Sequence, residues 1–272
     1  MTPEEYKKLS IKEFTQAAKI YDSGHAGIYE MCKDDYPPIL AELEKEDFHD
    51  VLDCGCGTGP MLELLHQKYP GKHYVGLDLT PEMIHVAQAK QLSNTEFLIG
   101  DSENLPFAEG SFDAIICANS FHHYPNPQDF FNSAYRVLRK GGRLILRDYT
   151  SSNVIVWLMN HLEMPLANLV GHGDVKVHKP AEFTAMAEKA GFTVLKMEKQ
   201  KGFRAHLVAR KRGEKRLHDV IICYRRFIYA SNASKSVLAR DLNNCRDNKY
   251  LFRLCFFSPS HVSHSAFQPG GS

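Results

Sequence analysis

A short segment at residues 53–59, DCGCGTG, places three glycines and one aspartate between an apolar strand-like run and an apolar helix-like run. A glycine-rich turn from a strand into a helix brings backbone N–H groups and a helix N-terminus against a ligand. A tight turn without any ligand also uses glycine, because glycine adopts positive φ without strain. Here a glycine occupies every second position, and this density favours a ligand-binding loop.

The position of the aspartate distinguishes two classes of nucleotide cofactor. Dinucleotide-binding loops have the spacing G-x-G-x-x-G, and their helix N-terminus faces a pyrophosphate. Here the spacing is Asp53-x-Gly55-x-Gly57-x-Gly59, and the carboxylate lies inside the loop. A carboxylate repels phosphate and accepts hydrogen bonds from an ammonium group. The loop therefore predicts a cofactor that is cationic at one end and lacks phosphate, and S-adenosylmethionine meets both conditions.

Strand-like and helix-like patterns alternate from about residue 49 onward. The expected strands are residues 50–54, 73–79, 95–100, 112–119 and 141–149. Helices are expected at residues 59–69, 81–92, 127–139 and 180–190. Two more strands are expected within residues 192–211, around the turn KQKG. Alternation with near-continuous apolar strands predicts an α/β fold, with a mostly parallel sheet that helices cover on both faces and a hairpin at its edge.

The composition excludes several classes of protein. The chain has 272 residues, of which 43% are hydrophobic, and a formal net charge of +1, so no global field attracts nucleic acid or an acidic membrane. No apolar run reaches the roughly 18 residues that a membrane helix needs. The N-terminus is polar, and the seven cysteines lack the spacing of a disulfide framework. We therefore expect a reduced, cytoplasmic protein with no membrane span.

Five motifs follow one another along the chain: VLDCGCGTG, VGLDLT, GDSENLPF, FDAIICANSFHHY and VLRKGGRLILRDY. Together they resemble the class I S-adenosylmethionine-dependent methyltransferases. Within that superfamily the chain is most similar to the small-molecule branch that includes the ubiquinone/menaquinone-biosynthesis C-methyltransferases. The resemblance covers about residues 10–211. It implies a Rossmann-like, seven-stranded, mostly parallel sheet with helices on both faces and an antiparallel edge hairpin.

The resemblance also implies which residues bind S-adenosylmethionine. Gly55 and Gly57 would approach the methionine part of the cofactor, and Asp53 would lie near its amino group. Asp78 would accept hydrogen bonds from both ribose hydroxyls, since Thr80 is the natural cap of the following helix. The full set that the resemblance implies is Tyr21, Asp53, Gly55, Gly57, Gly59, Asp78, Leu79, Asp101, Ser102 and Asn119.

Three further parts of this set have different expected roles. Asp101 and the Ser102 amide would read the adenine edge, although an ordinary aspartate turn is the alternative. Asn119 and Ser120 end the fourth strand beside the donated methyl group. Tyr21 resembles the tyrosine of the family's N-terminal lid.

Methyl transfer from a sulfonium is an in-line displacement, so the enzyme mainly aligns the reactants and excludes water. A general base is needed chiefly where the acceptor must lose a proton. His122 and His123 follow the fourth strand, and histidine accepts protons near neutral pH. We predict these two histidines and Asp148 as catalytic residues, with His122 slightly favoured. Packing or capping by one histidine is the alternative, and Tyr149 ranks behind this set.

The expected domain organisation has three parts. Residues 1–45 would form an N-terminal helical lid, and residues 46–212 the cofactor-binding domain. Within that domain, residues 153–178 would be a substrate-covering insertion. Residues 213–272 carry no motif and form an appendage or tail of unknown role. The residues expected to line an apolar acceptor pocket or to pack in the core are Trp157, Met159, Met164 and Leu166.

Two residue groups could bind metal, and we expect neither to do so. Cys54 and Cys56 are separated by one residue, whereas zinc-binding pairs typically have two to four between them. His172, Asp174 and His178 offer suitable ligand types, but nothing in the sequence makes them converge. Contact with the acceptor is the alternative for this second group.

The sequence therefore predicts methyl transfer to carbon, oxygen or nitrogen of a small hydrophobic or aromatic metabolite. A nicotinamide-dependent oxidoreductase and a non-catalytic S-adenosylmethionine-binding regulator are the alternatives. The expected partner is a small-molecule acceptor, and a homodimer is compatible with the chain. We expect no nucleic-acid substrate, because NSFHHY stands where amino-methylating nucleic-acid enzymes carry an Asn-Pro-Pro-Tyr-like element.

Overall fold

The structure is a computed structural model of the 272-residue chain, and it describes residues 1–18, 20–21 and 32–213. Residues Met1–Gly213 form one compact unit. The predicted appendage at residues 213–272 lies outside the described residues except for Gly213. Residues 19 and 22–31 of the predicted N-terminal helical lid do so as well.

The described residues form one seven-stranded sheet with the strand order β3-β2-β1-β4-β5-β7-β6. The strands are β1 Asp50–Cys54, β2 His73–Asp78, β3 Thr95–Ile99, β4 Phe112–Ala118, β5 Leu138–Tyr149, β6 Phe192–Gln200 and β7 Arg204–Lys211. β1 to β5 pair in parallel, and β7 pairs antiparallel with both β5 and β6. The predicted mostly parallel sheet with an antiparallel edge hairpin is confirmed.

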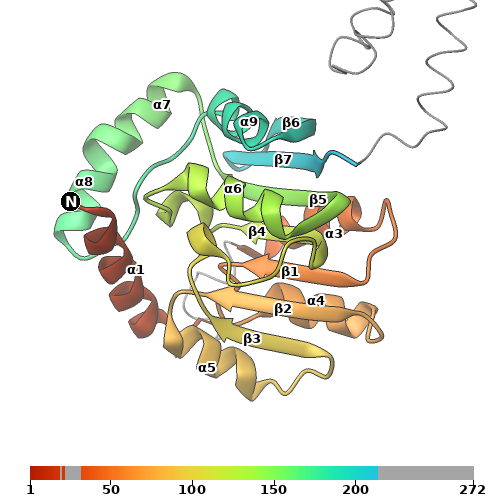
Figure 1. Cartoon of the computed structure of the whole chain (residues 1–272). Helices are drawn as coiled ribbons and strands as arrows, with labels where there is room; N and C mark the ends of the chain where they lie inside the picture. The colour runs from red at the N-terminus through yellow and green to blue at the C-terminus, as the bar shows by residue number, and fades with distance from the viewer. Residues whose placement is uncertain (19, 22–31, 214–272) are drawn as a thin grey trace, which may run out of the picture. The chain divides into compact units, whose positions relative to one another are not determined.

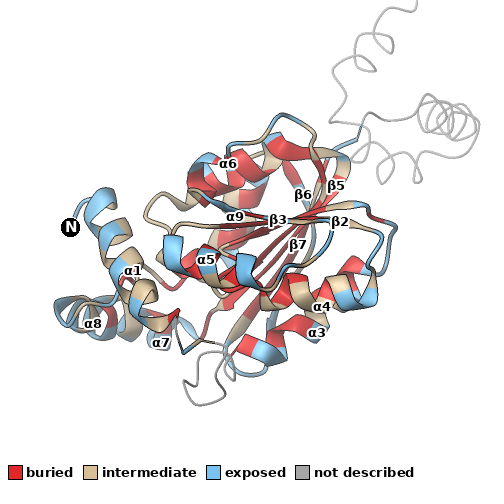
Figure 2. Cartoon of the chain, turned by 90° about the horizontal axis from the view of Figure 1, so that it is seen from below, coloured by how far each residue is buried: buried red, intermediate tan, exposed pale blue. Residues whose placement is uncertain are grey.

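Helices cover both faces of the sheet. Successive strand residues point to opposite sides, so each strand contributes side chains to both faces. Leu52 packs in a core cluster with residues of α6 (Pro127–Val137) and α9 (Pro180–Lys189). Its neighbour Val51 packs in the cluster on the other face. That second cluster includes residues of the helices α3 Tyr36–Leu43, α4 Pro60–Lys68 and α5 Pro81–Ala89. Figures 1 and 2 show the sheet between these two helical layers.

Proline starts the helices that follow the parallel strands. Pro60, Pro81 and Pro127 each open a helix within a few residues of a strand's carboxyl end. Proline suits this position because its fixed φ matches the helix and its missing N–H has no helical partner there. The helix N-termini are thereby held at the edge of the sheet where the parallel strands end.

The N-terminal helix α1, Pro3–Ala17, begins with a capping box between Thr2 and Glu5. It lies beside α7 and α8 in both ribbon views (Figures 1 and 2). Glu13 links it to the loop after α8, where its carboxylate accepts the Gly173 N–H at 2.8 Å and lies 2.6 Å from Nδ1 of His172. The helix is therefore anchored to a segment about 160 residues away.

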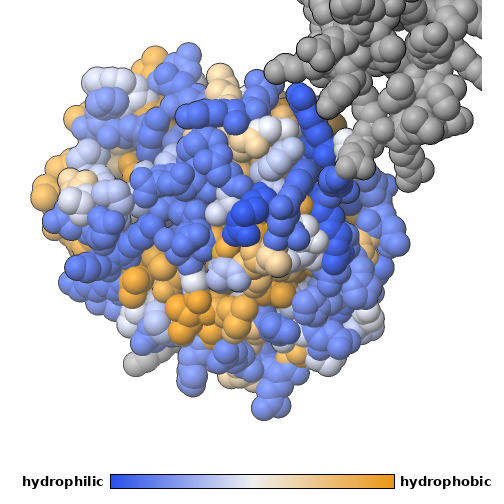
Figure 3. Space-filling model, in the orientation of Figure 1, coloured by the Kyte–Doolittle hydropathy of each residue, from blue (hydrophilic) through white to orange (hydrophobic). Residues whose placement is uncertain are grey.

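The apolar segment after β5 is a broken helix, with α7 Asn153–Leu158, a π-helical turn at Met159–Glu163 and α8 Met164–Leu169. Pro165 lies at the start of α8, where it cannot donate the hydrogen bond of a continuous helix. Figure 3 shows apolar side chains at the left edge of the view, where Figure 1 places α8.

This segment differs from the predicted acceptor pocket. Trp157 is 53% exposed and Leu166 is 63% exposed, so neither lines an enclosed cavity. Met164 is buried with Val156 and Val177, and Met159 packs against the same small cluster. The segment does not supply enough apolar neighbours to enclose the larger side chains. Across the described ranges, no helix has both the length and the apolar character needed to cross a membrane.

Candidate functional site

A cleft opens at the carboxyl ends of β1, β2 and β4, where α1 lies against the sheet. Open parallel sheets bind ligands outside the carboxyl ends of their strands. Of the predicted site residues, Tyr21, Gly55, Gly57, Asp78, Leu79, Asp101, Ser102, Asn119 and His123 line this cleft. Asp53, Gly59, His122 and Asp148 are predicted site residues that do not line it.

The glycines of the loop serve different purposes. Gly55 and Gly59 have φ of +70° and +78°, in the left-handed region that favours glycine. A Cβ at Gly55 would lie 1.9 Å from Oγ of Ser120, and one at Gly59 would lie 2.7 Å from the Phe97 ring. Close approach of the protein's own side chains therefore requires these two glycines.

Gly57 lines the cleft and has more space beside it than Gly55 or Gly59. Its φ is +54°, and the nearest atoms to a Cβ there would be those of the Tyr21 side chain, at 3.7 Å. Its N–H donates to Oδ2 of Asp78 at 2.9 Å, and Oδ1 of Asp78 accepts the Thr80 N–H at 2.8 Å. Asp78 thus joins the glycine loop to the start of α5, where the predicted cap Thr80 makes no side-chain capping bond. Each carboxylate oxygen can accept a second hydrogen bond from a ligand.

Two carboxylates beside the loop lack a cationic partner. Asp53 is 3% exposed, and burial raises its pKa to about 7, with a further contribution from the charge of Asp78. Burial also raises the pKa of Asp78, although hydrogen bonds from the Thr80 and Gly57 backbone partly offset burial. Neither forms an ion pair with a described residue. A bound cation would stabilise the charged form of both groups.

Asp101 lies at the opposite end of the cleft, where it caps the 3₁₀ turn Ser102–Asn104 and accepts the Glu103 N–H at 2.9 Å. Its other oxygen lies 2.7 Å from Nζ of Lys7 in α1. Burial lowers the pKa of Lys7, but hydrogen bonds to Asp101 and Glu103 outweigh burial and raise it. One carboxylate oxygen of Asp101 is therefore already paired with a residue of α1.

The sequence reasoning missed the part of α1 that contacts the cleft. Lys7, Ser10 and Phe14 line the cleft from one face of the helix. Their spacing of i, i+3 and i+7 is the helical signal that was available. What the spacing does not reveal is which strand ends this face covers, because α1 is far from them in sequence.

Asn119 provides a test of whether these residues fit S-adenosylmethionine. Its backbone has φ of +51°, and its Nδ2 donates to Oδ2 of Asp35 at 2.7 Å. Its Oδ1 is buried and finds no hydrogen-bond partner among the described residues. A buried acceptor without a donor is costly, and the cofactor's amino group supplies donors. The orphan acceptor, the two uncompensated carboxylates and the open Gly57 therefore fit a cationic ligand.

His122 lies behind the cleft wall and is held by Asp148. Its Nδ1–H donates to Oδ1 of Asp148 at 2.7 Å, and its backbone N–H donates to Oδ2 at 3.1 Å. Burial lowers the pKa of His122, but the charge and the hydrogen bond of Asp148 outweigh burial and raise it. Burial likewise acts to raise the pKa of Asp148, but the same pairing with His122 holds it below its usual value.

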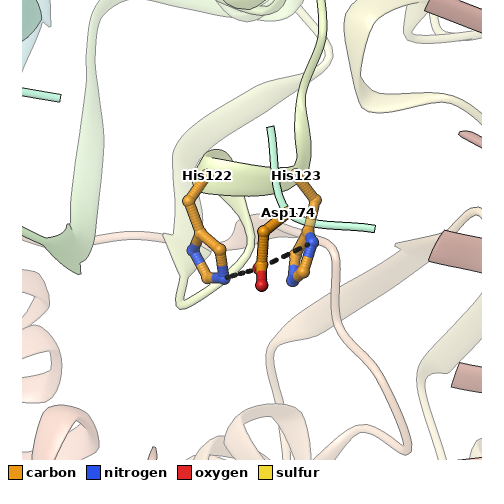
Figure 4. A group of neighbouring side chains, drawn as sticks. All are labelled: His122, His123 and Asp174. Carbon is orange, nitrogen blue, oxygen red and sulfur yellow. Dashed lines mark ion pairs between the residues drawn. The ribbon is translucent and has the colours of Figure 1, made fainter. Parts of the chain in front are cut away.

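His123 lines the cleft itself and packs edge-on against Phe14, with ring centroids 5.0 Å apart. Burial, together with the charge of His122, lowers its pKa to about 4. Asp174 places Oδ1 3.5 Å from Nε2 of His122 and 3.5 Å from Nδ1 of His123 (Figure 4). Two histidines and one carboxylate therefore form a polar corner beside the cleft, which His123 lines.

The two groups considered for metal binding from sequence have different outcomes. Cys54 and Cys56 are fully buried, and burial raises the pKa of each thiol well above its ordinary value. Thiols in this state are poor metal ligands. His172 lies instead against Glu13, and Asp174 is the one member of the second group that approaches His122 and His123. Asp174 approaches these histidines because of the path of the loop that carries it, and the spacing of residues along the sequence does not predict that path.

Comparisons with known proteins identify the core of the chain. A family model described as "Methyltransferase domain" matches residues 52–146. The demethylmenaquinone methyltransferase of Thermotoga maritima is 32% identical over 151 residues, which are 54% of this chain and 64% of that protein. The phthiotriol/phenolphthiotriol dimycocerosates methyltransferase of Mycobacterium leprae is 40% identical over 106 residues, which are 39% of each chain. The chain thus spans less than two thirds of the length of these relatives.

A solved structure agrees with these sequence matches at the level of the fold. The putative methyltransferase in complex with the Trm112 activator of Haloferax volcanii superposes with a TM-score of 0.63. The match covers 74% of this chain and 98% of that one at 21% identity, so it shows the fold alone. S-adenosylmethionine is the cofactor that these relationships imply, as the sequence motifs predicted. Residues 52–146 of the chain therefore form a methyltransferase domain, as the family model describes it.

Proposed function

We propose that the protein transfers a methyl group from S-adenosylmethionine to a small hydrophobic or aromatic acceptor. The observation that carries this proposal is the uncompensated negative charge of Asp53 and Asp78 beside the orphan acceptor of Asn119. These groups suit an ammonium and repel a pyrophosphate. A nicotinamide dinucleotide is therefore the poorer ligand of this cleft.

In this proposal, different residues of the cleft bind different parts of the cofactor. Asp78 accepts the ribose hydroxyls while it keeps its bonds to the Gly57 and Thr80 backbone. Asp101 and the Ser102 amide face the adenine, and Asn119 faces the amino group. When bound, the cofactor supplies a methyl group on a positively charged sulfur, which is already activated for displacement. The chain's task is then alignment and the exclusion of water.

We propose that α1 is the lid that excludes water. Three contacts hold it over the cleft: Lys7 with Asp101 at 2.7 Å, Thr15 Oγ1 with Glu82 at 3.0 Å, and Glu13 with the Gly173 N–H. The first two contacts reach the adenine end and the third reaches the loop before α9. Because the groups in these three contacts are polar and none of the contacts is fully buried, the lid can open at modest cost.

The acceptor would enter beside His123, and the His122–Asp148 pair would take its proton where it has one to lose. Asp148 holds the His122 ring by Nδ1, which leaves Nε2 as the basic nitrogen. The raised pKa of His122, which Asp148 causes against the effect of burial, suits proton transfer near neutral pH. His123, whose burial lowers its pKa to about 4, is the weaker base and contacts the acceptor.

The apolar character of the acceptor is inferred from the segment that adjoins the site. α7, the π-helical turn after it and α8 carry Trp157, Leu162 and Leu166, with more than half of each side chain exposed. An exposed apolar surface of this kind commonly marks a binding surface. The two curated relatives are named for different substrates, so relationship alone does not choose the acceptor.

A methyl-transfer screen with cofactor labelled on the methyl group tests the proposal. The purified full chain is incubated separately with quinol, phenol and amine pools, and label is counted in the extracted products. We expect label in at least one pool, and none with the Asp78→Asn variant at limiting cofactor. Tight cofactor binding without transfer to any pool would instead favour a non-catalytic regulator. Binding of NADH in place of S-adenosylmethionine would contradict the proposal.

A further inference from the structure

The polar corner beside the cleft has the composition of a metal site. His122 and His123 lie in the 3₁₀ turn Phe121–His123 after β4, and Asp174 lies in the loop between α8 and α9. Each offers one ligand atom, and the three atoms lie within 4.8 Å of one another. Figure 4 shows the Asp174 carboxylate between the two imidazole rings.

The two separations between Asp174 and the histidines match those of a tetrahedral ion, and the two histidine nitrogens lie within 4.8 Å of each other. Oδ1 of Asp174 lies 3.5 Å from Nε2 of His122 and 3.5 Å from Nδ1 of His123. Zinc binds nitrogen and oxygen at about 2.0–2.1 Å, so neighbouring ligands of a tetrahedral site lie about 3.4 Å apart. The distances are too long for strong hydrogen bonds and nearly right for a shared ion.

Asp148 orients His122 as a metal ligand is usually oriented. Metal-binding histidines commonly donate their second ring N–H to a carboxylate, which fixes the tautomer and raises ligand basicity. Nδ1 of His122 lies 2.7 Å from Oδ1 of Asp148, and the backbone N–H of His122 binds the other oxygen. The lone pair of Nε2 is therefore directed toward Asp174.

His123 supplies an unpartnered nitrogen. Its side chain is 11% exposed, and its buried Nδ1 finds no hydrogen-bond partner among the described residues. The neutral imidazole carries its proton on one ring nitrogen and a lone pair on the other. With the proton on Nε2, the unpartnered Nδ1 holds the lone pair.

The backbone on both sides of Asp174 is fixed. The Gly173 N–H donates to Glu13 at 2.8 Å on one side. On the other side, the N–H groups of Val175 and Lys176 donate to the His122 carbonyl at 2.9 and 3.1 Å. The carboxylate is therefore anchored to the same turn that carries the two histidines.

We propose that His122 Nε2, His123 Nδ1 and Asp174 Oδ1 form a three-ligand zinc site whose fourth position is open toward the cleft. Two imidazoles and one carboxylate suit zinc, and an open fourth position accepts water or an oxygen or nitrogen ligand. Such a donor set disfavours Mg²⁺, which prefers oxygen ligands. Zinc and a proton on Nε2 of His122 exclude each other. The site stands on its own geometry and does not depend on the proposed methyl transfer.

Zinc binding by the full chain tests the proposal without any activity assay. The protein is stripped with a chelator, dialysed and titrated with zinc chloride in a calorimeter, with zinc content measured by mass spectrometry. We expect a high-affinity site with one zinc per chain and little heat from magnesium chloride. Losing a residue that only supports a metal ligand typically lowers metal affinity about 10–100-fold. Asp174→Asn and His123→Ala each remove a ligand itself, so each should lower zinc affinity by more than that.

The control variant is His85→Ala, because His85 is exposed on α5 and belongs to no such group. It should bind zinc as the unaltered chain does. Circular dichroism checks the fold of each variant, and Asp174→Asn decides the question if His123→Ala fails to fold. Cobalt in the same site should give the intense visible absorption of tetrahedral coordination. Absence of a high-affinity site, or equal affinity in Asp174→Asn and the unaltered chain, would overturn the proposal.

Discussion

Two groups of buried carboxylates in this molecule have opposite surroundings. Asp35 is 2% exposed and lies 2.7 Å from Nε of Arg147 and 2.9 Å from Nε of Arg204. Asp148 is 1% exposed and is paired with His122. In this first group the chain supplies a positive group for each buried negative one.

The second group lies around the glycine loop. Asp53 and Asp78 are influenced mainly by burial, by each other and by backbone N–H groups, and burial raises the pKa of both. An unpaired buried carboxylate costs folding free energy. The chain pairs Asp35 with positive side chains but leaves Asp53 and Asp78 without such partners. The difference teaches that negative charge is left open where a positive ligand binds.

The largest effect is expected from breaking the buried pair of Asp148 and His122. Asp148→Asn removes the charge that orients His122 and raises its pKa, so the rate of transfer to an acceptor that loses a proton should fall about 10²–10⁴-fold. Cofactor affinity should change less than about threefold, because Asp148 does not line the cleft. Single-turnover rates at saturating cofactor, with calorimetry alongside, measure both. A loss of affinity as large as the loss of rate would contradict the assignment.

Breaking the compensated structural pair should affect stability instead of binding. Asp35→Asn leaves the buried guanidinium of Arg147 short of a charge partner, and breaking such a buried pair costs about 3–5 kcal/mol. Urea unfolding measures the loss. The matched control is Asp34→Asn at the exposed neighbour, which should stay within about 0.5 kcal/mol. Equal stability of the two variants would show that the pair is not a stabilising one.

Removing charge from the uncompensated group should affect cofactor binding. Asp78→Asn weakens hydrogen bonds to a charged acceptor, each worth about 1.5–3 kcal/mol, so affinity for S-adenosylmethionine should fall about 10–150-fold. Calorimetry measures the change. Asp129→Asn, at an exposed position in the first turn of α6, is the control and should bind normally. Unchanged affinity in Asp78→Asn would mean that the ribose contact lies elsewhere.

The smallest effect is a dependence of cofactor affinity on pH. Burial raises the pKa of Asp53 to about 7, so the carboxyl is mostly neutral at pH 6 and mostly charged at pH 8. The charged form attracts the ammonium of the cofactor, and affinity should therefore rise about tenfold between these two pH values. Asp53→Asn should flatten the profile. Affinity that falls across the same interval would give the opposite sign and exclude this role for Asp53.

Much of the fold follows from local sequence patterns. The apolar runs that become β1 to β4 were predicted within one residue at each end, because parallel strands covered on both faces need continuous apolar side chains. β5 begins at Leu138, three residues before the predicted start, where the predicted helix had been extended to residue 139. Within the predicted insertion at residues 153–178, the sequence did not reveal the π-helical turn at Met159–Glu163 that separates α7 from α8.

The site could be predicted as far as it depends on strand ends. Asp78 and Asn119 follow parallel strands, and the carboxyl ends of such strands meet at one edge of the sheet. Lys7 and Asp174 could not be placed, since each reaches the site from an element far away in sequence. The glycine loop was interpreted as a ligand cradle throughout, whereas Ser120 and Phe97 occupy the space beside Gly55 and Gly59.

Calorimetric titration of the full chain with S-adenosylmethionine, S-adenosylhomocysteine and NADH tests the central claim most directly. The claim is that the cleft binds a cationic nucleoside that lacks phosphate. We predict one site per chain for both amino-acid-bearing nucleosides, weakened together about 10–150-fold in Asp78→Asn, and no saturable heat with NADH. Saturable binding of NADH that displaces S-adenosylmethionine would contradict the account.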